Sequence, residues 1–158
     1  MVSYGYERSR FGLGLKLKGK MQMQADQLKL VLDSMILVHP MADQIAKSFY
    51  THLFEIAPHT KKLFTGDMDR QGTMLMTSLS LAMTGLSDMA SILPSVQALG
   101  ERHFSYGVKP EYFQPALDSF IWALEQHLGD QFNPALKEAW YSAFKSVVDA
   151  MLTAYDSK

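Results

Sequence analysis

Apolar residues recur at intervals of three and four along most of the chain, the spacing that one face of a helix requires. Leu28, Val31, Leu32, Met35 and Ile36 form the first such stripe. Similar stripes continue to the C-terminus, and no convincing strand pattern lies between them. The pattern predicts an all-helical domain without an internal repeat.

Proline and capping residues divide these stripes into separate helices. Proline is favoured in a first turn, so Pro40 and Pro134 mark helix starts, and it disfavours helical geometry in the residue before it. The side chain of Asn133 can cap the last helix, and Ser87 or Asp88 can cap the helix that begins near residue 88. We expect about seven helices, over about residues 26–39, 40–55, 58–64, 70–84, 88–105, 110–128 and 134–155.

The first 20 residues differ from the rest of the chain. They hold four glycines, which weaken a helix, and five basic residues against one acidic residue. Their apolar residues alternate with glycine or lysine, at Phe11, Leu13, Leu15 and Leu17. We interpret residues 1–20 as a flexible or loosely packed extension and residues 21–158 as one domain. Docking of the extension to an anionic membrane or to a partner protein is the alternative.

Composition and charge narrow the functions open to the domain. Residues 21–158 hold 10 basic and 15 acidic residues, so we expect no binding to nucleic acid. Cysteine is absent, which excludes disulfides, thiolate metal sites, cysteine nucleophiles and a thioether-linked haem. We find neither a secretory signal nor a spanning apolar run, and we expect a cytoplasmic protein.

The stretch "LGERHFSYGVKP", residues 99–110, places His103 near the end of a helix. A lone histidine there more often has a structural role than a ligand role. Val96, Leu99 and His103 share one face, however, and that face is otherwise apolar. A ring nitrogen buried there needs a partner, and an iron centre is one candidate. The other ring nitrogen can bond a backbone carbonyl one turn earlier, which fixes the tautomer.

A second wall is predicted on the helix at about 70–84. Gln71, Leu75 and Leu79 are four residues apart, so they form an apolar surface with one amide donor at its edge. Three aromatic residues of the preceding segments can face the same space: Phe49, Tyr50 and Phe64. Each of these residues alone is more commonly solvated or part of the core. Together they suit a flat macrocycle held between two walls.

The order and spacing of these residues resemble the bacterial single-domain globins and the globin part of flavohaemoglobins. The resemblance lies in "SFYTHLFEIAPHTKKLF", "RQGTMLMTSLSLAMTGL", "ILPSVQALGERHFSYGVKPEYF" and "LKEAWYSAFKSVVDAML". It covers about residues 25–155. It implies a globin fold, a three-over-three helical sandwich, around one haem b.

The resemblance also implies roles for single residues. His103 matches the proximal iron ligand, and Tyr50 and Gln71 match the distal hydrogen-bond donors. The remaining expected haem contacts are Phe64, Leu75, Leu79, Leu99, Val108, Phe113 and Phe49. In flavohaemoglobins a tyrosine and a glutamate support the proximal histidine. Those positions fall at Phe113 and near Ser157 here, so we expect no such relay, and Tyr112 should point elsewhere.

The primary functional hypothesis is reversible binding of O2, and also of NO and CO, at ferrous haem. Nitric oxide dioxygenase activity is one alternative. Because "GLGLKLKG" lacks the spacing of a dinucleotide-binding loop, that activity would need an external reductase. A gas sensor that signals to a partner is another alternative, and a haem-free scaffold is disfavoured by His103. Tyr50 as a ligand of ferric iron stays open, as does the choice between monomer and homodimer.

Overall fold

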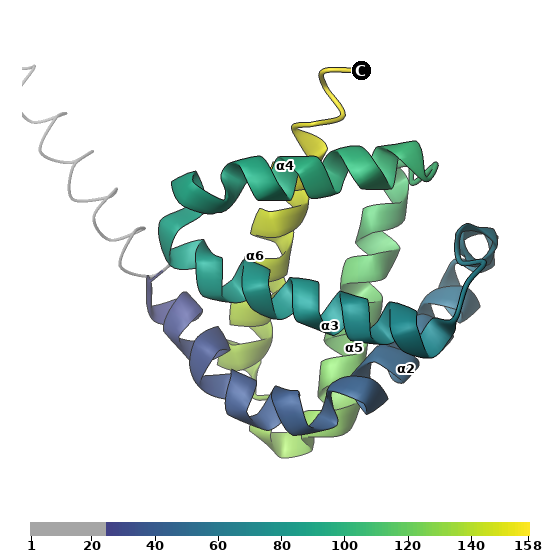
Figure 1. The fold of residues 1–158 in the computed structure, drawn as a ribbon. Helices are drawn as coiled ribbons and strands as arrows, with labels where there is room; N and C mark the ends of the chain where they lie inside the picture. The colour runs from purple at the N-terminus through teal and green to yellow at the C-terminus, as the bar shows by residue number, and fades with distance from the viewer. Residues whose placement is uncertain (1–24) are drawn as a thin grey trace, which may run out of the picture.

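The computed structural model describes residues 25–158, and that part of the chain is helical without a strand (Figure 1). Residues 25–38 form the first helix. The later α-helices are α2 (Ala42–Ile56), α3 (Met68–Gly85), α4 (Met89–Ser105), α5 (Phe113–Leu128) and α6 (Pro134–Leu152). Short 3-10 helices join them: η1 (His39–Met41), η2 (Pro58–Leu63), η3 (Leu86–Asp88), η4 (Pro110–Tyr112) and η5 (Gly129–Gln131). The predicted all-helical class is confirmed, and the predicted extension at residues 1–20 lies outside the described residues.

The predicted helix boundaries differ from the observed ones by a few residues. Asn133 caps α6 as predicted, because its side chain accepts a hydrogen bond from the Leu136 amide at 2.9 Å. The start of α3 was placed too late, because Asp67 caps the helix and was taken as part of a polar connection. The segments opened by Pro40 and Pro110 begin as 3-10 turns, and α6 ends at Leu152.

One large core takes most of its residues from α2, α5 and α6, and the first helix and α3 add to it. In Figure 1, α5 and α6 run side by side behind α3, and α4 packs on α6. Trp140 of α6 is fully buried, and its indole Nε1 donates to the Ser34 hydroxyl at 2.9 Å. The first helix is thereby attached to α6. The other fully buried large side chains are Phe120, Ile45, Met83, Leu124, Val31 and Val38.

Two glycines set how closely the site-bearing helices approach their neighbours. A Cβ on Gly100 of α4 would lie 2.3 Å from the Met151 carbonyl oxygen of α6. A Cβ on Gly72 of α3 would lie 3.0 Å from the Ala46 Cβ of α2. Because no larger residue fits without movement, these contacts fix where α3 and α4 lie.

The helical run Met68–Ser105 is apolar and long enough, by composition alone, to cross a membrane. Its two halves, α3 and α4, are joined at η3 and pack against α2 and α6 (Figure 1). We therefore treat them as two helices of the domain. Only 17% of the most apolar window is buried by the described residues, so much of this run is left uncovered by residues 25–158.

Candidate functional site

Tyr50 of α2 lies inside a group of aromatic side chains. Its ring meets Phe49 edge-on at 4.8 Å between centroids and Phe64 edge-on at 5.2 Å. Phe54 lies 6.0 Å away on the same helix and also contacts Phe64. The aromatic contacts restrict the Tyr50 ring, which is 6% exposed. Tyr50 therefore presents its hydroxyl from a fixed position.

Tyr50 and Gln71 meet, as the sequence suggested they could. Burial raises the pKa of the Tyr50 phenol to about 12, and hydrogen bonding with the Gln71 side chain opposes that rise. The phenol is protonated at neutral pH, as an unperturbed tyrosine also is, and it keeps its O–H donor. Gln71 is half-buried and adds an amide donor from α3.

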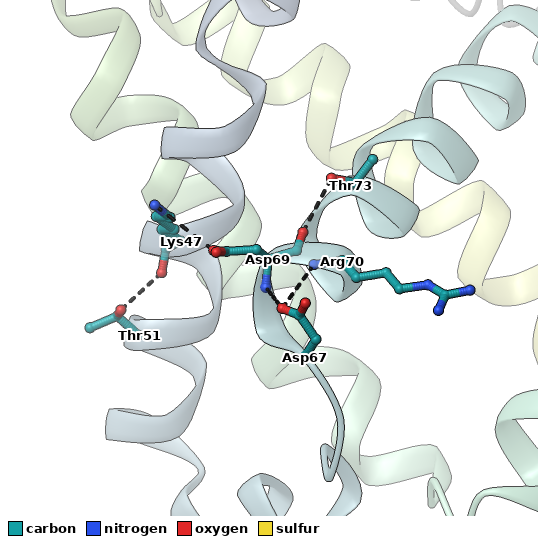
Figure 2. A network of polar contacts seen from close by, with 6 residues as sticks. All are labelled: Lys47, Thr51, Asp67, Asp69, Arg70 and Thr73. Atoms are coloured by element: carbon teal, nitrogen blue, oxygen red, sulfur yellow. Dashed lines mark hydrogen bonds and ion pairs between the residues drawn. The ribbon is translucent and has the colours of Figure 1, made fainter.

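A polar network at the start of α3 holds Gln71 in place (Figure 2). The Asp67 carboxylate accepts hydrogen bonds from the amides of Asp69 and Arg70 at 2.9 and 3.4 Å. The Asp69 carboxylate lies 3.9 Å from Lys47 Nζ, which joins this turn to α2. The Thr73 hydroxyl donates to the Asp69 carbonyl at 3.2 Å. The helix terminus beside Gln71 is thus capped and attached to the helix that carries Tyr50.

His103 lies half-buried near the end of α4, with one ring nitrogen occupied. Its Nδ1 is 2.8 Å from the Leu99 carbonyl oxygen. Since a carbonyl only accepts, Nδ1 carries the proton and Nε2 carries a lone pair. Burial lowers the pKa of the imidazole, the bond to Leu99 partly opposes this, and the Arg102 charge adds to it. The neutral ring is the form that can ligate a metal.

The residues around His103 include one that the sequence analysis missed. Phe113 lies 5.9 Å from the His103 ring, and Tyr155 lies 6.0 Å beyond Phe113. The Tyr155 hydroxyl donates to the Val108 carbonyl at 2.9 Å. The available signal was the apolar stripe of α6, because Tyr155 continues the spacing of Val148 and Leu152. Tyr112 instead contacts His59, with 4.9 Å between the ring centroids.

The other predicted contact residues divide into two groups. Phe64, Leu75, Leu99 and Val108 are half-buried and pack against the core. Phe49 and Leu79 are only 5% and 7% exposed. The first group is partly accessible, as contact with a ligand requires, and the second group belongs to the core.

The side chains present distinguish between a bare metal ion and a haem as the partner of His103. The described residues contain no group of three or more histidine, cysteine or acidic side chains that could hold a metal ion. Among them, no hydrogen bond occupies His103 Nε2. A single neutral imidazole between apolar walls suits iron that arrives within a macrocycle, whereas a bare ion needs several protein ligands. The residues fit a haem.

The chain is similar in sequence to bacterial flavohemoproteins. The chain is 23% identical over 128 residues to a flavohemoprotein of Bacillus subtilis, covering 79% of this chain and 32% of that protein. It is 27% identical over 114 residues to a flavohemoprotein of Oceanobacillus iheyensis, covering 70% of this chain and 28% of that protein. The chain therefore spans about a third of the length of these relatives.

Solved structures show the same fold. A bacterial globin from Campylobacter jejuni matches with a TM-score of 0.71 at 20% identity, over 84% of this chain and 99% of its own. A second match is an engineered carbene transferase from Rhodothermus marinus, whose parent is named as a nitric oxide dioxygenase. Its TM-score is 0.75 at 20% identity, and the match covers 83% of this chain and 92% of that chain. The predicted globin fold is confirmed. The sequence model of the globin family matches residues 47–151, more than half of the chain, and this protein therefore belongs to the globin family.

Proposed function

We propose that this globin is a haem b protein that binds O2 reversibly, with His103 as the proximal ligand. The observation that carries the proposal is the Nδ1 bond from His103 to Leu99, which orients a neutral imidazole and leaves Nε2 with a lone pair. When bound, haem supplies a ferrous iron with a coordination position open to O2, NO or CO. Membership of the globin family supports haem as the cofactor. The absence of cysteine supports haem b, because no thioether can form.

Tyr50 and Gln71 act as the distal donors in this proposal. The buried and restricted ring of Tyr50 supports a donor role, since its hydroxyl is presented from a fixed position. A hydrogen bond to a charge-bearing ligand is worth about 1.5–3 kcal/mol, or roughly 10- to 150-fold in affinity. Bound O2 should gain from both donors, and the less polar CO should gain less. The proposal therefore favours tight O2 binding with slow release.

The test is the O2 dissociation rate of the Tyr50→Phe variant. We expect release to be about tenfold faster or more, because one hydrogen bond to the ligand is lost. CO release should change much less. Tyr112→Phe is the matched control, because that tyrosine contacts His59. An unchanged O2 rate in Tyr50→Phe would contradict the distal role, and a purified protein that takes up no haem would contradict the whole proposal.

Nitric oxide dioxygenation is the second candidate, and the names of the relatives favour it. One nitric oxide, one O2 and one electron from a donor give one nitrate ion, so the atoms and charge balance. Tyr50 and Gln71 would hold the oxygen, and the electron would come from a separate reductase. Nitrate formation in the presence of a generic reductase tests this candidate. Binding of O2 without nitrate formation would contradict dioxygenation and would leave reversible O2 binding as the function.

A further inference from the structure

The basic side chains of residues 25–158 fall into two sets. Lys29, Lys47, Lys137 and Lys145 form ion pairs with acidic residues. Within the described residues, the other six have no ion pair, and five of these six flank the site. We call these five exposed residues the cationic rim: Lys61, Lys62, Arg70, Arg102 and Lys109.

Each part of the cationic rim is close in sequence to a site residue. Arg70 directly precedes Gln71, and Arg102 directly precedes His103. Lys62 is two residues before Phe64, and Lys109 directly follows Val108. The rim residues therefore lie on the same segments as the site residues of α3 and α4.

Two contacts join the distal and proximal parts of the rim into one edge of the molecule. Leu63 at the end of η2 comes within 3.9 Å of the Cβ position of Gly107. The rings of His59 in η2 and Tyr112 in η4 are 4.9 Å apart. Lys61 and Lys62 are thus on the segment that meets residues 107–112. In Figure 2 the Arg70 side chain points away from the α3 capping network.

The acidic residues on the same segments neutralise the rim only in part. Asp67 is engaged in capping α3, and Asp69 pairs with Lys47 of α2. Glu101 and Glu111 remain. Residues 58–71 and 101–112 together hold five basic and four acidic residues. The rest of 25–158 holds five basic and eleven acidic residues. These segments therefore carry a net charge of +1 and the rest of 25–158 a net charge of −6, so an anionic partner is repelled least at the site edge.

We propose that the cationic rim docks an acidic electron-donor protein, which rests on the proposed haem function. The five cations are spread over four segments, a wider area than one small anion covers. In the docked complex one electron would pass from the reduced donor, which is oxidised, to ferric iron, which becomes ferrous. Electron-transfer complexes of this kind have small, polar interfaces that depend on charge complementarity.

The experiment is a calorimetric titration of the ferric holoprotein with an acidic plant-type ferredoxin as the probe, at low ionic strength. Lys61→Glu/Lys62→Glu should weaken binding about tenfold or more, because it reverses the densest part of the rim. Lys29→Glu/Lys137→Glu is the matched control with the same change in net charge, and it should weaken binding by less than about twofold. Added salt should weaken binding to the wild type.

Three results would overturn the docking proposal: no binding to the wild type, salt-independent binding, or equal weakening by both double variants. Binding to the haem-free protein but not to the holoprotein would also overturn it, since the haem carboxylates would then occupy the rim. Lys109→Glu provides a second rim variant if Lys61→Glu/Lys62→Glu does not fold. Absorption spectra recorded separately distinguish failure of the proposed function from failure of the docking proposal. A protein without bound haem contradicts the proposed function. A protein with bound haem whose binding to ferredoxin does not depend on the rim contradicts only the docking proposal.

Discussion

The Tyr155 hydroxyl donates a hydrogen bond to the Val108 carbonyl oxygen at 2.9 Å, across 47 positions of the chain. The Val108 amide in turn donates to the His103 carbonyl at 3.1 Å. Tyr155, three residues beyond the end of α6, is thus connected to the segment that follows the proposed iron ligand. Tyr155 therefore helps to position the segment after His103.

Replacing Tyr155 with Phe should loosen this segment while keeping the ring contacts with Phe104 and Phe113. We expect a loss of about 1 kcal/mol in the free energy of unfolding, because one partly buried hydrogen bond is removed. Haem loss to an acceptor apoprotein should become faster. Denaturant unfolding and haem transfer measure the two effects. Equal haem loss from Tyr155→Phe and the wild type would show that Val108 is positioned by other contacts.

Gly100→Ala should disturb the packing of α4 on α6. The new Cβ would lie 2.3 Å from the Met151 carbonyl oxygen, so the helices must separate. We expect a destabilisation of about 1–3 kcal/mol, the usual cost of overpacking, measured by chemical denaturation. Gly66→Ala is the control, because nothing lies within 4 Å of its Cβ position. Equal stability of the two variants would contradict the close approach of α4 and α6.

Asp67→Ala should fray the start of α3. The variant loses the side-chain acceptor for the amides of Asp69 and Arg70, which costs about 1 kcal/mol. Hydrogen exchange of the first-turn amides should accelerate, and Asp67→Ser should largely restore their protection. If exchange is unchanged in Asp67→Ala, the contact between Asp69 and Lys47 is sufficient to hold this turn.

Stability should fall with rising pH between about 10 and about 12, partly because of Tyr50. Its pKa is 10.0 when unperturbed and about 12 in the folded protein. In this interval the unfolded chain releases the phenolic proton while the folded protein retains it, so unfolding is favoured. The maximal contribution is about 2 to 3 kcal/mol. Unfolding measured from pH 9 to about 12 should show a shallower decline in Tyr50→Phe, and parallel curves would contradict the shift.

Local signals in the sequence were sufficient for the helices and for their class. Asn133 and Pro134 defined the start of α6, because a cap and a first-turn proline act within a few residues. Asp67 has the same capping chemistry, but it lies in a segment rich in other polar residues. Its role became clear only from the distances to Asp69 and Arg70.

Tertiary relationships were less accessible from the sequence. Spacing on α4 put His103 and Leu99 on one face, and the structure contains the bond between them. Spacing alone did not connect Tyr155 to Val108, because that contact depends on how α6 packs against α4. Phe49 lies beside Tyr50 on α2, and Leu79 lies one turn after Leu75 on α3. Periodicity therefore did not distinguish these two core residues from residues that contact a ligand.

The most direct test of the central claim is a haem titration of the wild type and of His103→Ala, followed by absorption in the ferric and ferrous states. The wild type should bind haem with the spectrum of an imidazole-ligated globin, and the ferrous form should become stably oxygenated in air. His103→Ala should lose that spectrum, and added imidazole should restore it, because the free ligand can take the place of the ring. An unchanged spectrum in His103→Ala, without imidazole, would contradict His103 as the iron ligand.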